Sequence, residues 1–180
     1  MASSIRFTSY PRTEPPPPFI PEVIGIFRSV EGSISTVALD KGLTSDGVLA
    51  LLRPGLKGLG FQIEAGKQKA DKIERPVFYG ENGRPALNYQ IDAYQPDWRC
   101  GLEVEAGRAW MGNAVYRDLV QALVMVQVDH VVLAVPNGYK YQSGGRTVTS
   151  ADYGNTTSVA DALYGHTRMR LPYGLTVIGY

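Results

Sequence analysis

A strand, a helix and a second strand follow one another between residues 102 and 136, and this order constrains the fold more than any other feature of the sequence. Residues 102–106, LEVEA, alternate apolar and acidic side chains, which is typical of a strand with one buried face. Apolar side chains then recur at helical spacing and predict a helix of about twenty residues: Met111, Val115, Leu119, Ala122 and Val126. Residues 129–136, DHVVLAVP, are nearly all apolar, as expected of a strand buried inside a sheet. Such a connection is a right-handed crossover, so the two strands should be parallel.

Weaker signals place further elements on both sides of this unit. A short helix is expected within residues 21–33, and a helix from about 45 to 53 follows a capping signal at Thr44 or Ser45 and ends or kinks at Pro54. Residues 60–66 resemble a first strand, and residues 75–94 predict a strand, a turn at 81–83 and a second strand. A loop, a short helix near 156–164 and a final strand near 174–179 follow. The sequence thus indicates an α/β domain with a central mixed β-sheet flanked by helices.

The length of 180 residues is that of one domain with an ordinary core. Residues 1–20 are polar and proline-rich, with four consecutive prolines at 15–18, and predict an extended arm. Residues 21–180 then form the single domain. A hydrophobic fraction of 44% with a charged fraction of 19% is typical of a globular protein and excludes a disordered chain.

The composition also bears on the compartment. The most apolar run, residues 119–136, is interrupted by Gln121, Gln127, Asp129 and His130, so we expect no membrane span. The first 23 residues lack the apolar core of a signal peptide, so we do not expect secretion. The single Cys100 excludes an internal disulfide and a cysteine-based zinc site, which favours a reducing compartment such as the cytoplasm.

Three acidic residues, Asp92, Glu103 and Glu105, stand in a segment that otherwise predicts two strands and a turn, NYQIDAYQPDWRCGLEVEAGR at 88–108. Carboxylates have low strand propensity and avoid burial, so their positions need an explanation. If residues 89–94 and 101–106 pair about a turn centred between Asp97 and Trp98, Asp92 lies directly opposite Glu103, and Glu105 shares that face. Four apolar side chains then gather on the opposite face, toward the core: Ile91, Ala93, Leu102 and Val104.

Converging carboxylates repel one another, and their pKa values rise unless positive charge compensates. A divalent cation such as Mg²⁺ is the usual compensation, because it takes oxygen ligands and keeps waters for a substrate phosphate. One or two such ions can polarise a phosphodiester. In the other interpretation, Glu103 and Glu105 merely line the solvent side of an edge strand. The opposed Asp92 and the crossover helix favour the metal site.

Asp92, ten intervening residues, the EVE sequence at 103–105, a helix and the strand HVVLAVP together resemble the PD-(D/E)XK nuclease superfamily, which includes many type II restriction endonucleases. The resemblance covers about residues 44–136 and includes the order helix, strand, hairpin, helix, strand. It implies a restriction-endonuclease-like core in which Asp92 and Glu103 hold the metal. Glu105 takes the position where the family usually has lysine, although some restriction enzymes of the superfamily carry Glu or Gln there.

Other residues complete the expected site. A lysine from the segment after the first strand is a candidate for the missing positive charge, with ordinary solvent-exposed lysines as the alternative: Lys67, Lys69 or Lys72. Glu64, on the polar face at the end of that strand, is a candidate fourth catalytic acid beside Asp92, Glu103 and Glu105. Asp97 is not the expected metal ligand, because only five residues separate it from Glu103 and it stays in the turn.

Residues that contact DNA are harder to predict. The net charge of +1 neither supports nor excludes a nucleic-acid partner. Arg117 and Gln121, on the polar stripe of the helix, are candidates for phosphate contacts, with a solvated helix face as the alternative. Arg168 and Arg170, beside His166, form a local basic patch that suits a DNA backbone. His130, at the start of the buried strand, is expected to be a core residue.

The resemblance implies a Mg²⁺-dependent DNA endonuclease, with Mn²⁺ as a substitute for Mg²⁺. A restriction-type enzyme that cuts both strands should be a homodimer, because one such site cuts one strand. The alternative is a catalytically degenerate nuclease fold that binds DNA or serves as an assembly subunit, which the missing lysine and the near-neutral charge favour. A third interpretation, a glycoside hydrolase, also uses paired carboxylates. Acids directly opposed across a hairpin suit metal binding better.

Overall fold

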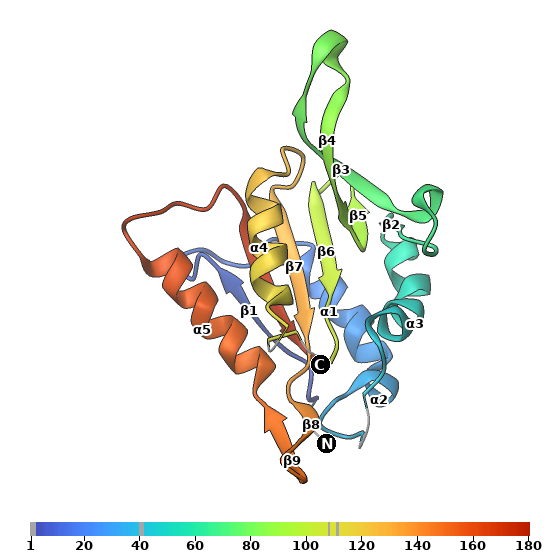
Figure 1. Ribbon diagram of the computed structural model, residues 1–180, viewed down its shortest axis with the longest axis vertical. Coiled ribbons are helices and arrows are strands. Elements are labelled where there is room, and N and C mark those ends of the chain that lie inside the picture. Colours follow the sequence, from blue (N-terminus) through green and yellow to red (C-terminus); the bar gives the residue numbers. More distant parts are fainter. Residues whose placement is uncertain (1–2, 40–41, 108, 111) are drawn as a thin grey trace.

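A six-stranded mixed sheet forms the centre of the computed structural model, which describes residues 3–39, 42–107, 109–110 and 112–180 (Figure 1). The three middle strands are parallel, and the outer strands on both sides run antiparallel to their neighbours. In spatial order the strands are β1 (Arg6–Tyr10), β10 (Gly174–Gly179), β7 (His130–Val135), β6 (Cys100–Val104), β5 (Ala93–Gln95) and β2 (Gln62–Ile63). The expected α/β domain with a central mixed sheet is confirmed.

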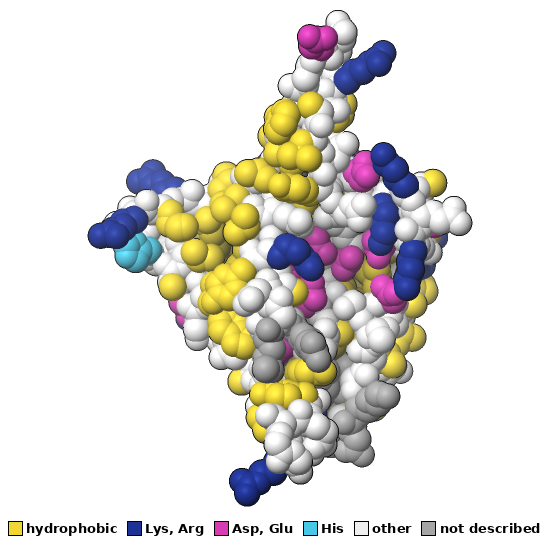
Figure 2. Space-filling view, in the orientation of Figure 1, with side chains coloured by type: hydrophobic (Ala, Val, Ile, Leu, Met, Phe, Trp, Pro, Cys, Tyr) yellow, Lys and Arg dark blue, Asp and Glu magenta, His cyan; other side chains and the backbone are white. Residues whose placement is uncertain are grey.

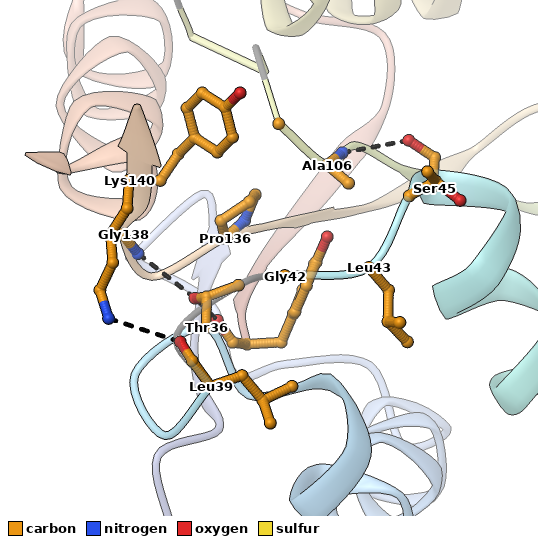
Figure 3. A pocket seen from close by; sticks show the side chains of 13 residues that line it. Thr36, Leu39, Gly42, Leu43, Ser45, Ala106, Pro136, Gly138 and Lys140 are labelled. Atoms are coloured by element: carbon orange, nitrogen blue, oxygen red, sulfur yellow. Dashed lines mark hydrogen bonds between the residues drawn. The ribbon is translucent and has the colours of Figure 1, made fainter. Parts of the chain in front are cut away.

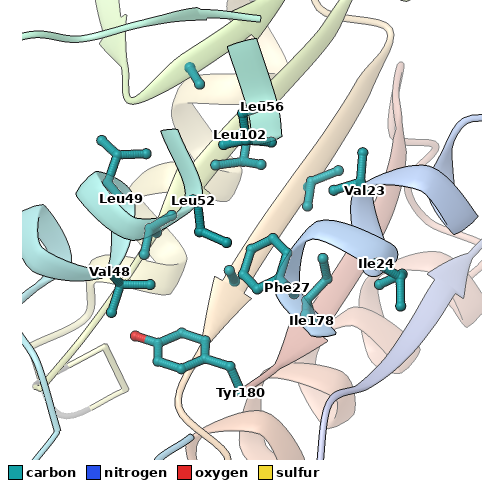
Figure 4. Packing of buried hydrophobic residues seen from close by; sticks show 14 of the residues in the cluster. Val23, Ile24, Phe27, Val48, Leu49, Leu52, Leu56, Leu102, Ile178 and Tyr180 are labelled. Atoms are coloured by element: carbon teal, nitrogen blue, oxygen red, sulfur yellow. The ribbon is translucent and has the colours of Figure 1, made fainter. Parts of the chain in front are cut away.

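Helices cover both faces of this sheet, and each face has its own core. On one face pack α1 (Ile20–Ser29), α2 (Glu31–Ile34) and α3 (Ser45–Gly58), with Phe27 at the centre of the cluster in Figure 4. On the other face pack α4 (Ala114–Val124) and α5 (Asp152–Gly165). None of the helices in the described ranges is long and apolar enough to cross a bilayer.

The predicted crossover is present in the structure. β6 and β7 are parallel, with Leu102 paired to Val132, and α4 connects them. All six residues of β7 are buried, because successive side chains point to opposite faces of the sheet and both faces are covered by a core. Val132 and Ala134 join the core of α1 and α3, whereas Val131, Leu133 and Val135 join that of α4 and α5. A strand covered on both faces needs the continuous apolar run that the sequence shows.

Two helices differ in length from the prediction. α3 begins at the predicted cap, where the Thr44 side chain accepts the N–H of Gly47, but it continues through Pro54 to Gly58. Burial of Leu52 and Leu56 on either side of Pro54 outweighs the hydrogen bond that proline removes. α4 has eleven residues instead of about twenty. Met111, which we expected on its buried face, lies outside the described residues.

Two hairpins stand apart from the main sheet. β3 (Ile73–Tyr79) and β4 (Pro85–Ile91) flank the predicted turn, where the short 3-10 helix η2 spans Glu81–Gly83, and the pair projects from the body of the molecule (Figure 1). A second 3-10 turn, η1 (Lys69–Asp71), precedes β3. β8 (Tyr139–Ser143) and β9 (Arg146–Ser150) occupy a segment that we predicted as a loop. Gly144 and Gly145 both have positive φ there, which is the backbone of a tight hairpin turn.

The first twenty residues are not simply an extended arm. Arg6–Tyr10 pair over five residues with β10, and Ile5 and Tyr10 are buried. The proline run at 15–18 lies between this strand and α1. This pairing could not be predicted from local sequence pattern, because the partner strand is more than 160 residues away.

Candidate active site

Asp92 occupies a bend between β4 and β5, and its position follows from the predicted hairpin. β5 and β6 pair in the predicted register, with Ala93 opposite Leu102, so Asp92 precedes β5 at the position facing Glu103. Asp92 Oδ2 accepts the backbone N–H of Val104 at 2.8 Å. The carboxylate thus replaces a strand carbonyl as the partner of this N–H group, which fixes Asp92 against β6.

Because of the bend at Asp92, the preceding residue, Ile91, packs on the face of the sheet opposite to the one that we expected. We expected Ile91 to pack with Ala93, Leu102 and Val104, but Ile91 belongs to the core of α4 on the opposite face. Its side chain lies over Gly101, where a Cβ atom would collide with it. The strict alternation that we assumed for residues 89–94 breaks at Asp92, because β4 leaves the main sheet there.

Asp92 and Glu103 line one cavity of about 390 Å³ together with side chains from four other segments. Glu64, just after β2, is a further lining residue, and its backbone N–H donates to the Asp92 carbonyl at 2.9 Å. Figure 2 shows acidic side chains gathered near the middle of one face with Lys and Arg side chains around them. The structure thus brings three of the four predicted acids, Asp92, Glu103 and Glu64, to the same cavity.

Glu105 is oriented differently from Glu103. Its backbone N–H continues the pairing to β7 by donating to the Ala134 carbonyl at 2.8 Å, but Glu105 is not among the residues that line the cavity. Its carboxylate lies 2.7 Å from a guanidinium nitrogen of Arg117 on α4. The same nitrogen lies 2.8 Å from Asp118 Oδ1, so Arg117 bridges the two carboxylates.

Lys72 is the lysine that the structure places at the site. Its Nζ lies 2.7 Å from Glu64 Oε2, and it lines the cavity, whereas Lys67 and Lys69 do not. The hydrogen bond to Glu64 raises the Lys72 pKa, which keeps the ammonium charged at neutral pH.

Asp118 is a site residue that the sequence reasoning missed. It lies on α4, its side chain is only 2% exposed, and it lines the cavity beside Glu103. Asp118 Oδ2 has no hydrogen-bond partner among the described residues. The signal was present, since Asp118 precedes Gln121 by three positions and so extends the polar stripe of the helix.

Burial of like charges shifts the pKa values of these acids upward. Burial raises the pKa of Asp92 to about 6, and burial together with Asp92, Asp118 and Glu105 raises that of Glu103 well above its usual range. Burial also raises the pKa of Asp118, and burial and the neighbouring Asp118 raise that of Glu105 to about 8. Each shift opposes ionisation, so the cluster lacks positive charge to balance it.

The donor chemistry of the cavity fits a hard divalent cation. Its acidic residues offer only oxygen atoms, and one of these oxygens, Asp118 Oδ2, is buried and unpartnered. In the described part of the chain, no three acidic, histidine or cysteine side chains are gathered closely enough to hold a cation by themselves. Mg²⁺ is commonly bound through one or two carboxylates, with waters and substrate phosphates completing its shell.

The predicted DNA contacts divide into two groups. Arg117 and Gln121 line the cavity, and the Arg117 side chain is 58% exposed. Arg168 and Arg170 lie between α5 and β10 and do not line it. Asn88 and Gln90 on β4, which we did not predict, present exposed amides at the cavity. His130 is buried, as expected, and Asp97 is exposed in the turn.

A second cavity of about 410 Å³ lies at the end of the sheet where β7 leaves it (Figure 3). Its polar groups bond to one another: the Ser45 hydroxyl accepts the Ala106 N–H at 3.1 Å, and the Thr36 hydroxyl accepts the Gly138 N–H at 3.4 Å. No acidic side chain lines it among the described residues. The candidate ligands for a cation are therefore the carboxylates of the first cavity.

Comparison with known proteins supports the fold. No protein-family model matches the sequence. No curated protein matches it either. Among solved structures, the chain is similar to the restriction endonuclease BglII, solved as a complex with a DNA 16-mer, with a TM-score of 0.52 and 11% identity over 97% of this chain and 75% of that chain. The chain has a restriction-endonuclease-like fold. At 11% identity this similarity describes the fold alone.

Proposed function

We propose that this protein is a Mg²⁺-dependent endonuclease that hydrolyses phosphodiester bonds in DNA. The observation that carries the proposal is the placement of Asp92 opposite Glu103 in one cavity with Lys72. The nuclease-like fold supports it, because BglII is an endonuclease and its structure contains DNA. Asp92 and Glu103 would hold the cation, which when bound supplies Lewis-acid polarisation of the phosphate and an ionised water.

The remaining side chains of the cavity bind and orient the substrate. Lys72, held by Glu64, directs a positive charge into the cavity and takes the role of the missing lysine toward the phosphate. Arg117 reaches solvent and contacts a phosphate from the outer side of the site. Glu105 holds Arg117 in this position.

A homodimer completes the proposal, since one site cuts one strand. The solvent-facing side of α4 exposes a row of apolar side chains at helical spacing, which suits packing against a second copy: Tyr116, Val120, Leu123 and Val124. A Val120→Lys substitution should shift the protein from dimer to monomer in sedimentation velocity experiments. An unchanged sedimentation coefficient would contradict the use of this face.

DNA cleavage tests the function. Supercoiled and linear DNA are incubated with wild type, Asp92→Ala and Asp97→Ala in Mg²⁺, Mn²⁺ or EDTA. We expect metal-dependent cleavage by wild type and Asp97→Ala, and a loss of at least about 10²-fold for Asp92→Ala. Asp97 is the matched control because it is exposed and outside the cavity.

The second candidate is a DNA-binding or assembly protein on a degenerate nuclease fold. The Glu105–Arg117 ion pair favours this candidate. Glu105 stands where the family usually has lysine, and its carboxylate is engaged by Arg117. In that case wild type binds DNA without cleaving it, and Asp92→Ala binds equally well. Metal-dependent cleavage that Asp92→Ala abolishes would contradict this candidate.

A further inference from the structure

Asp118 has an unusual environment for an aspartate on a helix. Its side chain is 2% exposed, and Arg117 contacts Oδ1 through two nitrogens, at 2.9 and 2.8 Å. Oδ2 accepts no hydrogen bond from an N–H or hydroxyl group in the described part of the chain, and the carboxyl group of Glu105 lies within hydrogen-bonding reach of the Asp118 carboxylate. A buried carboxylate oxygen without a partner is costly. Such an oxygen therefore points to a water molecule or an ion that binds there.

Asp118, which carries this oxygen, is one of the residues that line the acidic cavity. Arg117, Asp118 and Gln121 line it from α4, and the same cavity is lined by Asp92 and by Glu103 of β6. The negative charges of Asp118 and Asp92 both act on Glu103. Arg117 cannot balance the whole cluster, because its guanidinium is already shared between Asp118 and Glu105.

We infer that Asp118 is a further cation-binding residue, whose free Oδ2 accepts a hydrogen bond from a water molecule of the hydrated divalent cation held by Asp92 and Glu103. This rests on the proposed function in that it uses the same cation. Contact through water agrees with the absence of three closely gathered ligands among the described residues. Mg²⁺ keeps several of its waters, and partners that hold such waters strengthen metal binding.

Binding of Mn²⁺ to the full-length protein without DNA tests the inference, because this readout does not depend on cleavage. Titration calorimetry should show Asp118→Asn binding Mn²⁺ about 10- to 100-fold more weakly than wild type. Arg117→Gln is the matched comparison. It removes a positive charge from the same site, so it should bind Mn²⁺ at least as tightly as wild type.

The two variants separate cation binding from a structural role. If Asp118 only positioned Arg117, both substitutions would change Mn²⁺ affinity in the same direction, and that result would overturn the inference. So would wild-type affinity in Asp118→Asn, or no Mn²⁺ binding by wild type at millimolar concentration. Asp118-dependent Mn²⁺ binding by a protein that cleaves no DNA would support the inference and refute the proposed function.

A second variant guards against misfolding of Asp118→Asn. Asp118→Leu replaces the buried, unpaired oxygen with an apolar side chain of similar size, which should raise the midpoint of thermal unfolding in EDTA. Addition of Mn²⁺ should then raise this midpoint less than it does for wild type. An equal Mn²⁺-induced rise in the two proteins would overturn the inference.

Discussion

At the scale of single residues, the site combines acids that destabilise one another. Asp92 keeps its place through one hydrogen bond from the Val104 N–H group, while burial and Glu64 and Asp118 oppose its charge. Buried acids with raised pKa values are typical of functional sites. They lower the stability of the fold, and a bound cation would balance their charge.

The pKa of Asp92 leads to a prediction about stability. Because its pKa rises from 3.8 to about 6 on folding, the folded state binds more protons than the unfolded state between these values. Stability therefore falls as pH increases through this window and stays lower above it. In EDTA at pH 8, Asp92→Asn should be more stable than wild type by about 1–3 kcal/mol.

Urea denaturation at pH 4 and pH 8 measures this difference, and the two proteins should converge at pH 4. Asp97→Asn, at an exposed position, should match wild type at both values. If Asp92→Asn were less stable than wild type at pH 8, the carboxylate would be stabilising, and the electrostatic description of the cavity would be wrong.

At the scale of secondary-structure elements, two units position the acids. The β5–β6 hairpin sets Asp92 against Glu103, and the crossover through α4 brings Asp118 and Arg117 over the same strand. Gly101 on β6 allows Ile91 to lie close to the strand, directly before the bend at Asp92. The bend and the glycine therefore depend on each other.

Gly101→Ala tests this dependence. The added Cβ collides with the buried Ile91 side chain, so we expect a loss of about 1–3 kcal/mol in unfolding free energy and a loss of Mn²⁺ affinity as Asp92 shifts. Gly83→Ala provides a comparison at a glycine with open space around it, although its positive φ adds a small strain of its own. Wild-type stability in Gly101→Ala would show that Ile91 moves without cost.

At the scale of the whole molecule, segments near both ends of the sequence support the core. β1 pairs with β10 along one edge of the sheet. The Tyr180 hydroxyl donates to the Glu105 carbonyl at 2.6 Å, and the Tyr180 carbonyl accepts the Asn137 N–H at 2.8 Å. The site residue Glu105 is thus held by a residue 75 positions later.

Removal of residues 1–10 should destabilise the whole protein, although they were expected to form an arm. The deletion exposes the edge of β10 and removes the buried Ile5 and Tyr10, so we expect a fall of at least about 10 °C in the unfolding midpoint. Differential scanning calorimetry measures it. A midpoint within about 2 °C of wild type would show that the strand contributes little to stability.

The local sequence pattern was sufficient for those elements whose structure depends on residues close together in the chain. Alternation and helical spacing predicted β6, α4 and β7, and the turn at Asp97–Trp98 predicted the register that sets Asp92 opposite Glu103. The three acids were visible because charge in a strand contradicts the apolar pattern around it. Tertiary structure decided which of them share the cavity, since Glu105 turns to Arg117 while Glu64 and Lys72 enter from a distant segment.

Tertiary structure alone also brought β1 to the sheet and Asp118 into the cavity. The pairing of β1 with β10 joins residues far apart in sequence, and the cavity that Asp118 lines includes Glu64 and Lys72 from a distant segment. Periodicity reports which face of an element is buried, but it does not report the partner that buries it. The fold class and three of the acids that line the cavity, Asp92, Glu103 and Glu64, could therefore be predicted from the sequence, and the full membership of the site could not.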